Sequence, residues 1–174
     1  MNRVEQILQD SFYQECMIRN QAKEVDRKFC KHTIQHVIDV ARIAYIIMME
    51  SGDLNRFIEE HGLAGRPVGK EIIYAAALLH DIGRWQEYET GKDHASLGAS
   101  LAVEILERAG FNRGEVRIIT CAIREHRNIE ENMSLLGERL YRADNLSRIC
   151  SQCEANYECY KFDDMETGKK ALIY

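Results

Sequence analysis

Apolar residues recur three or four positions apart along almost the whole chain, and this helical period constrains the fold more than any other feature. The 174 residues include one proline, Pro67, and few of the alternating runs that form β-strands. The period predicts helices over about residues 4–12, 34–49, 54–60, 70–80 and 94–109. It also predicts a helix that ends near His126 and a last long one through Asp144. Residues 62–69 are expected to form a loop, and 84–92 lack a clean period.

Residue types at the ends of these segments support several of the helix boundaries. Gly110 is expected to stop one helix, and Asn112 with Glu115 three residues later forms a capping-box-like start for the next. Ser134 can cap the last long helix. From Cys150 the composition changes to three cysteines, four aromatic residues and few aliphatic ones. We therefore expect one domain over residues 1–149 and a C-terminal extension over residues 150–174.

Composition and charge exclude some classes of partner. A hydrophobic fraction of 45% supports a sizeable core, whereas a net charge of −5 does not favour an extended nucleic-acid surface or an anionic membrane. The N-terminus lacks the apolar stretch of a signal peptide, and no apolar run reaches the length of a membrane span. The expected location is the cytoplasm. The oligomeric state is left open, a homodimer included.

Five segments place metal-ligating side chains on core-facing stripes or at helix ends. The dipeptide His80-Asp81 closes an apolar run, and the other members are His36, His94, His126 and Asp144. Imidazole and carboxylate together suit iron, manganese or zinc, and a helical bundle can supply such ligands from facing helices. Taken singly, each histidine has an alternative interpretation as a satisfied core residue, and each aspartate as a cap or a surface charge.

The order of these residues resembles the HD superfamily of metal-dependent phosphohydrolases over roughly residues 30–149. The matching segments are residues 36–41, 77–83 and 140–146. The resemblance implies an all-α HD-domain bundle with a metal site between the helices. The stretch from His94 to Asp144 is similar to the bacterial symmetrical diadenosine-tetraphosphatase branch. This likeness implies two metals, with Asp81 as the bridging ligand, and a ligand set of His36, His80, Asp81, His94, His126 and Asp144.

The same resemblance implies a reaction. One or two divalent ions (Fe, Mn, Zn, Ni, Co or Mg) would hold a hydroxide that attacks the phosphorus of a small phosphorylated substrate, a nucleotide foremost. Asp81 and Arg84 are the expected catalytic residues. Cationic side chains expected to bind the phosphate, each with a surface role as the alternative, are Arg84, Lys92, Arg127 and Arg148.

Two other classes of function use the same pattern. A di-iron oxygenase of the same superfamily would use the six ligands to activate oxygen. A non-catalytic regulatory module would keep the site to sense a metal or a nucleotide. An intact ligand set argues against the second of these alternatives.

Three side chains beyond this set have two interpretations each. His32 lies four residues before His36. It is either an accessory ligand or a hydrogen-bond partner of the ligands, or else an ordinary core or surface histidine. Trp85 either stacks on a nucleobase or packs under the loop, and packing is favoured. His61, beside Gly62, is expected at the surface.

The cysteines of the C-terminal extension have metal-like spacing. Cys150, Cys153 and Cys159 form a second candidate metal site. A four-ligand site would need a further thiol from Cys16, Cys30 or Cys121, which are distant in sequence. The alternative is three free thiols in a reducing compartment.

Overall fold

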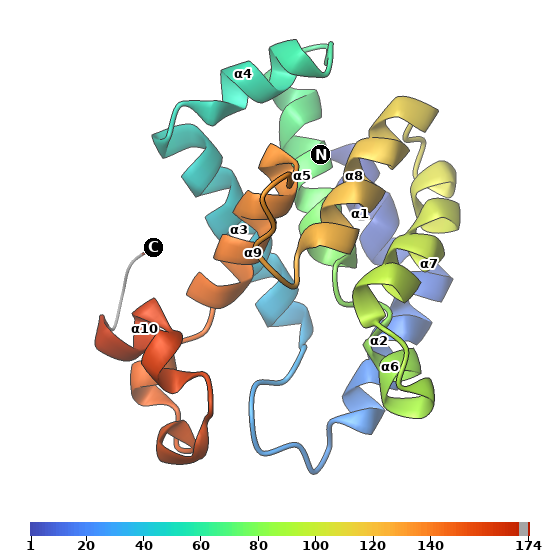
Figure 1. The fold of residues 1–174 in the computed structure, drawn as a ribbon. Coiled ribbons are helices and arrows are strands. Elements are labelled where there is room, and N and C mark those ends of the chain that lie inside the picture. Colours follow the sequence, from blue (N-terminus) through green and yellow to red (C-terminus); the bar gives the residue numbers. More distant parts are fainter. Residues whose placement is uncertain (171–173) are drawn as a thin grey trace.

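The fold was obtained as a computed structural model that describes residues 1–170 and 174. It is built from helices, with no strand among the described residues, so the expectation of an all-α chain is confirmed. Figure 1 shows the long helices side by side with short segments at both ends of the bundle. The α-helices are α1 (Asn2–Gln9), α2 (Ser11–Lys23), α3 (Ile34–Glu50), α4 (Asp53–Glu60), α5 (Arg66–Leu79), α6 (Arg84–Thr90), α7 (His94–Arg108), α8 (Arg113–Glu125), α9 (Leu135–Leu146) and α10 (Glu166–Lys169).

The core lies where α3, α5, α8 and α9 pack together (Figure 1). The alanine-rich end of α5 is buried on all sides, because Ala75, Ala76 and Ala77 let neighbouring helices approach closely. On one side α7 packs against α8, and the short α6 packs against α2 and α7. The last residues of α5 therefore deliver His80 and Asp81 into the centre of the bundle.

Side-chain caps fix the starts of several helices, two of which the sequence predicted. Asn112 and Glu115 form a complete capping box at α8, and Ser134 accepts a hydrogen bond from the N–H of Gly137 at α9. Thr33 caps α3 and Asp93 caps α7 in the same way. These caps place His94 as the first residue of α7 and hold Asp144 within α9.

The structure differs from the sequence-based expectations in three places. The first predicted helix stops at Gln9, because Asp10 is extended and its carboxylate caps a second helix that the sequence did not predict. The expected loop over 62–69 ends early, since α5 starts at Arg66 with Pro67 in its first turn, where a missing N–H costs nothing. The aperiodic segment 84–92 contains α6, which buries only Trp85 and therefore shows no stripe.

The segment after α9 consists of short turns around α10. Three 3-10 helices, Cys150–Gln152, Asn156–Glu158 and Phe162–Asp164, precede α10. Cys150, Ala155, Met165 and Thr167 are buried, so this segment packs on the bundle end near α9 (Figure 1). The predicted extension runs to residue 174, and its residues 171–173 lie outside the described part. Among the described helices, none has both the length and the apolar character to cross a membrane.

Candidate metal centre

The six predicted ligands converge from five helices on one buried point. His36 lies in the first turn of α3 and Asp144 in the third turn of α9. His80 and Asp81 follow α5, His94 opens α7, and His126 follows α8. The five residues other than Asp144 are at most 7% exposed, and Asp144 is half-buried. The apolar stripe that buries each helix thus also turns its polar residue inward.

Asp81 lies between two groups of histidines. Its Oδ2 is 2.9 Å from Nε2 of His80 and 3.7 Å from Nε2 of His36. Its Oδ1 is 3.3 Å from Nε2 of His94 and 3.7 Å from Nε2 of His126. One oxygen of Asp81 therefore faces each group of histidines, so its carboxylate belongs to both sets of potential ligands.

Asp144 completes the first of these groups. Its Oδ1 is 3.1 Å from Nε2 of His36 and 3.9 Å from Nε2 of His80. Two sets of potential ligands within 4.8 Å of one another follow from this geometry, His36–His80–Asp81 and Asp81–His94–His126. A nitrogen and oxygen donor set of this kind suits a divalent transition metal.

Backbone carbonyls fix the tautomer of two ligands. Nδ1 of His80 donates to the carbonyl of Ala77, and Nδ1 of His126 donates to the carbonyl of Ile123, both over 2.6 Å. Because a carbonyl only accepts, the proton of each neutral ring is on Nδ1 and the lone pair is on Nε2. Both lone pairs face Asp81, as metal ligation requires.

For His94 and His36, side chains rather than backbone carbonyls fix the tautomer. Nδ1 of His94 lies 2.9 Å from a carboxylate oxygen of Glu87, a pairing that raises the basicity of a ligand. Nδ1 of His36 lies 3.1 Å from Oγ of Ser147, whose own proton goes to the carbonyl of Asp144. Ser147 must then accept from His36, which leaves the lone pair of His36 on Nε2, 2.8 Å from the guanidinium of Arg148.

Several polar atoms in this centre have no suitable partner in the protein. Nε2 of His80 and Oδ2 of Asp81 are buried without a hydrogen bond. Nε2 of His94 and Nε2 of His126 lie 3.2 Å apart, although both are acceptors in the tautomers that Glu87 and Ile123 select. Buried acceptors that face one another are costly unless a cation lies among them. The residues present therefore fit divalent ions.

The electrostatics of the centre favour ionised carboxylates. Burial raises the pKa of Asp81, but His80, His32 and Arg84 outweigh it and hold this pKa well below its usual range. Burial also raises the pKa of Asp144, but the hydrogen bond with His36 and the charge of Arg148 outweigh it, so this pKa too lies well below its usual range. Two anionic carboxylates in a buried cluster produce a negative potential that a cation satisfies.

The histidine pKa values reflect burial and these carboxylates. Burial lowers the pKa of His94, so this ring is held in the neutral form that binds metal. Burial also lowers the pKa of His36, but the side chains of Asp144 and Asp81 outweigh it and raise the value overall. The raised pKa of His36 therefore reflects its two carboxylate neighbours.

His32 belongs to this cluster, which its sequence position left open. It is 3% exposed, and its Nε2 lies 3.6 Å from Oδ2 of Asp81. Its Nδ1 pairs with the buried carboxylate of Glu24, which also accepts from the hydroxyl of Tyr88. His32 thus has the same tautomer and the same orientation as the predicted ligands. Glu24 gave no sequence signal, because its helix was not predicted.

Asn20 is a second residue that the sequence did not reveal. Its amide donates to the carbonyl of Asp81 over 2.9 Å and accepts from the N–H of Trp85 over 2.8 Å. The side chain is fully buried. Asn20 therefore connects α2 to the turn that follows α5. Trp85 packs in the core with the guanidinium of Arg19 over its ring, as its sequence context favoured.

The predicted phosphate-binding residues differ in position. Arg84 donates to Oδ1 of Asp81, and Arg148 lies 2.8 Å from Nε2 of His36. Arg127 is exposed and pairs with Asp93 and Glu87. All three line a cavity of about 190 Å³ beside the centre. Lys92 is exposed and lies outside the lining of that cavity, so the structure does not bring it to the centre.

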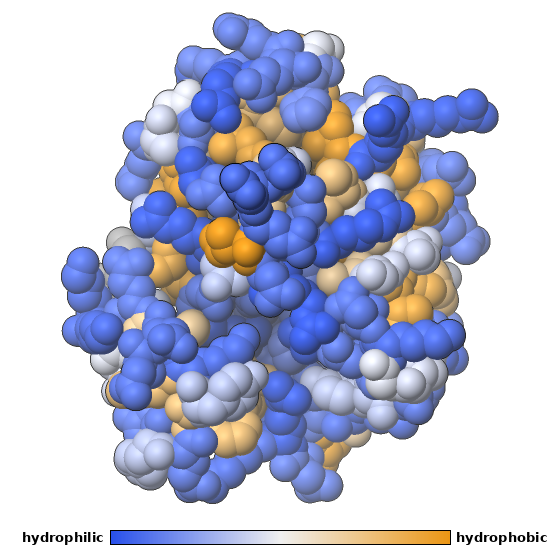
Figure 2. Space-filling model, in the orientation of Figure 1, coloured by the Kyte–Doolittle hydropathy of each residue, from blue (hydrophilic) through white to orange (hydrophobic). Residues whose placement is uncertain are grey.

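Figure 2 shows a mainly hydrophilic face of the molecule. A shaded hollow near the middle of this mainly hydrophilic face agrees with the polar lining of the cavity. Arg27 and Lys161 also line it, so five cationic side chains surround a space in a protein of net charge −5. His61 is exposed at the end of α4, away from this lining.

Comparison with known proteins places these observations in a family. The family model described as HD domain matches residues 33–149. An uncharacterized protein of Clostridium beijerinckii is 40% identical over 170 residues, which are 97% of this chain and 98% of that protein. No solved structure gave a match.

More distant relatives are large bifunctional enzymes. The bifunctional uridylyltransferase/uridylyl-removing enzyme of Ruegeria pomeroyi is 31% identical over 96 residues, or 55% of this chain, and that of Novosphingobium aromaticivorans is 30% identical over 95 residues, or 52%. The chain spans about a tenth of the length of these two relatives. The finer resemblance to the diadenosine-tetraphosphatase branch stays a prediction. With the HD domain match over most of its length, the chain belongs to the HD domain family.

Proposed function

We propose that this chain is a metal-dependent phosphohydrolase that cleaves a phosphate ester or anhydride of a nucleotide or another small phosphorylated metabolite. The observation that carries the proposal is the position of Asp81. Its two oxygens face two separate groups of histidines whose Nε2 lone pairs are all turned inward. Membership of the HD domain family supports the same class of reaction.

The ligands divide into two sets around Asp81. His36, His80, Asp81 and Asp144 would hold one divalent ion, and Asp81, His94 and His126 a second. Divalent ions held there would supply Lewis acidity, since such ions lower the pKa of water and polarise phosphoryl oxygens. His32, with its Nε2 on the same carboxylate oxygen as His80, is an additional neutral donor beside the first set.

Cationic side chains of the chain itself are positioned to bind and orient an anionic substrate. Arg84 and Arg148 are mostly buried and each contacts a carboxylate or histidine of the centre. A guanidinium can pair with two phosphate oxygens at once, which fixes the direction of the substrate. Arg127 stands at the exposed edge of the same cavity and suits a distal phosphate.

The names of the distant relatives support a nucleotide as the substrate class. The segment shared with this chain occurs in enzymes named uridylyl-removing, and a uridylyl group is attached through a phosphate. The similarity covers 55% of this chain in the first of these relatives and 52% in the second, so the substrate is to be identified by a direct screen.

The test combines metal analysis with a screen for released phosphate. The chain is purified anaerobically, its metal content is measured, and nucleotides and dinucleoside polyphosphates are offered as substrates. We expect divalent metal in the protein and phosphate release from at least one substrate. The variant His80→Ala/Asp81→Ala should lose phosphate release and the metal bound at the His/Asp centre, and the matched control His61→Ala, an exposed histidine, should keep both.

Two outcomes would contradict the proposal. Oxygen consumption by an iron-loaded protein without phosphate release would point to a di-iron oxygenase. Tight nucleotide binding without turnover, at full metal occupancy, would point to a regulatory module. A metal content in His80→Ala/Asp81→Ala equal to that of wild type would refute the ligand assignment itself.

A further inference from the structure

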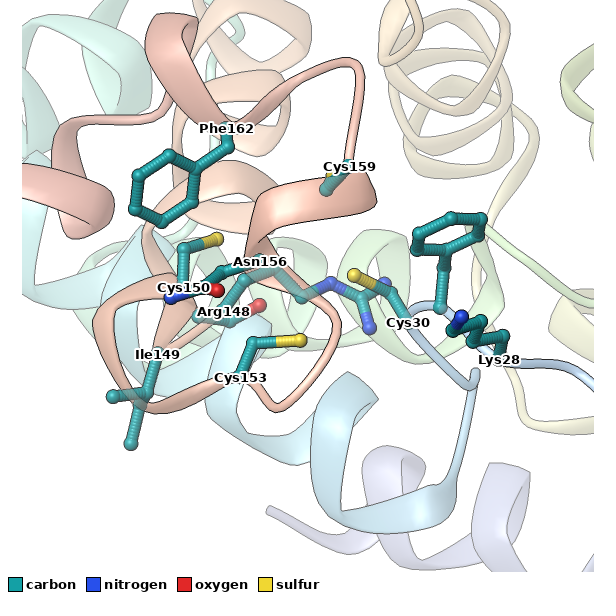
Figure 3. Close-up of a pocket in the computed structure, with 11 residues that line it drawn as sticks. Lys28, Cys30, Arg148, Ile149, Cys150, Cys153, Asn156, Cys159 and Phe162 are labelled. Atoms are coloured by element: carbon teal, nitrogen blue, oxygen red, sulfur yellow. The ribbon is translucent and has the colours of Figure 1, made fainter.

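Four cysteines from two distant parts of the sequence line one cavity. Cys150, Cys153 and Cys159 belong to the turns after α9, and Cys30 lies in the loop between α2 and α3. All four border a cavity of about 290 Å³. Figure 3 shows the thiols of Cys30, Cys150 and Cys153 directed toward a common space, with Cys159 on its border. The fold therefore selects Cys30 as the fourth thiol from the three distant cysteines.

The local backbone holds two of these thiols in a turn. Residues Cys150–Gln152 form a 3-10 helix, and the N–H of Cys153 donates to the carbonyl of Cys150 over 3.2 Å. A turn of this kind brings the sulfurs of a Cys-x-x-Cys pair to one side, and this spacing is common in zinc sites. The next turn, anchored by the N–H of Asn156 on the carbonyl of Cys153, returns the chain toward Cys159.

All four cysteines line the same cavity, so their thiols are neighbours. Burial is the main reason why the pKa of the Cys150 thiol is raised, and the nearby Cys30, Cys159 and Cys153 thiols raise it further. Cationic side chains, Lys28 and Arg148, also line the cavity. Four thiolates around a divalent ion carry a net charge of −2, so positive groups at this position offset it.

We propose that Cys30, Cys150, Cys153 and Cys159 form a tetrathiolate metal site, separate from the His/Asp centre, that binds Zn²⁺. Four protein thiolates and no open position are the ligand set of structural zinc. No three of these sulfurs lie within 4.8 Å of one another among the described residues, so binding requires rotation of the cysteine side chains toward the ion. An ion bound there would thus draw together the loop that contains Cys30 and the turns after α9.

The site has a structural consequence for the neighbouring centre. Cys30 precedes His32 by two residues, and Cys150 follows Asp144 by six. Arg148 already connects these segments, because it donates to the carbonyl of Lys31 and contacts His36. Cys30, Cys150 and Cys159 also line the cavity beside the His/Asp centre. Zinc would hold the wall of that cavity in place.

The experiment measures zinc in four forms of the full chain. Wild type and His80→Ala/Asp81→Ala should each retain one zinc that resists mild chelation, which separates this site from the His/Asp centre. Cys30→Ser/Cys153→Ser should lose it, whereas Cys121→Ser, a cysteine outside the cavity, should retain it. Zinc loss should also expose the chain after residue 150 to limited proteolysis.

A second measurement on wild-type protein covers the case in which the double variant does not fold. Titration with a mercurial reagent should release one zinc as four thiols react, followed with a zinc-sensitive dye. Iron with acid-labile sulfide in place of zinc would overturn the assignment of Zn²⁺. Zinc-replete protein in which these four thiols react freely, or form disulfides, would overturn the site.

Discussion

At the scale of single residues, the metal centre depends on which ring nitrogen of each histidine carries the proton. Carbonyls hold the Nδ1 protons of His80 and His126, and Glu87 holds that of His94. These partners bind Nδ1 and leave Nε2, the ligand atom, available. They therefore select the tautomer that can bind metal in the absence of an ion. They are therefore positioning groups whose removal should weaken metal binding without removing a ligand.

Glu87→Ala tests this role. Loss of the carboxylate frees the ring of His94, so the affinity for the ion held by His94 and His126 should fall about 10- to 100-fold. The affinity of the ion on the His36 side should change much less. Competition with a chelator of known affinity measures both. Glu89→Ala, an exposed carboxylate two residues later that pairs with Lys23, is the matched control and should leave both affinities unchanged.

At the scale of elements, the turn that carries His80 and Asp81 touches the backbone of α7. A Cβ atom on Gly83 would lie 2.5 Å from the carbonyl oxygen of His94 and 2.6 Å from the backbone nitrogen of Gly98. Both contacts are with backbone, so no side-chain rotation relieves them. Gly83 is thus required for the close approach that places Asp81 beside His94.

Gly83→Ala should therefore lower the free energy of unfolding by about 1–3 kcal/mol, the usual range for overpacking a well-packed site. Metal affinity should fall with it, because the turn and α7 must separate. Gly98→Ala is the control, since its Cβ would meet atoms no closer than 3.4 Å and alanine favours a helix. Chemical denaturation measures the free energy of unfolding of both variants. Equal values for Gly83→Ala and Gly98→Ala would refute the requirement for glycine at position 83.

The junction between α1 and α2 contributes a pH-dependent stability. Asp10 accepts hydrogen bonds from the N–H groups of Phe12 and Tyr13, and Arg108 at the end of α7 donates to both of its oxygens. The hydrogen bond from Arg108 is the main cause that lowers the pKa of Asp10 below its ordinary value of 3.8. The folded state thus prefers the ionised carboxylate.

Asp10→Asn keeps a capping side chain but loses the charge. A group with a lowered folded pKa stabilises the fold above its unfolded pKa and loses this contribution as the pH falls through the folded value. The variant should be less stable than wild type by about 0.5–1 kcal/mol near neutral pH, since the pair is partly exposed. In urea unfolding, the difference should shrink as the pH falls below 3.8. Asp26→Asn, in the exposed loop after α2, should show no such difference.

At the scale of the whole molecule, the metal centre joins elements that are far apart in sequence. Ligands come from α3, from the ends of α5 and α8, and from α7 and α9, which are also the helices of the core. An ion that binds only the folded chain stabilises it by about 2.7 kcal/mol at a free concentration one hundred times the Kd. The stability of this protein should therefore depend on metal.

Exhaustive chelation should lower the Tm by several degrees, and added divalent metal should restore it. The size of the restored shift should rise with the metal concentration, as linkage requires. In His80→Ala/Asp81→Ala the part of the shift due to this centre should disappear. A Tm that is the same with and without metal in wild-type protein would mean that the ions do not tie these helices together.

The helices that the sequence predicted correctly are those with one buried face. In α3, α7, α8 and α9, apolar residues and capping side chains agree, so local information was sufficient. The helices that were missed, α2 and α6, obtain their stability from tertiary contacts. Asn20 of α2 and Trp85 of α6 are buried against each other, and neither produces a periodic pattern alone.

The sequence by itself determined the family and the order of six metal-ligating residues, because these follow from residue types at fixed places along the chain. Only the tertiary structure decided that His32 faces Asp81, that Glu24 and Asn20 support the centre, that Lys92 lies outside the cavity, and that Cys30 meets the C-terminal cysteines. The contacts of His32, Asn20 and Cys30 join residues about 50 or more positions apart and are set by how the helices pack, so no local pattern encodes them.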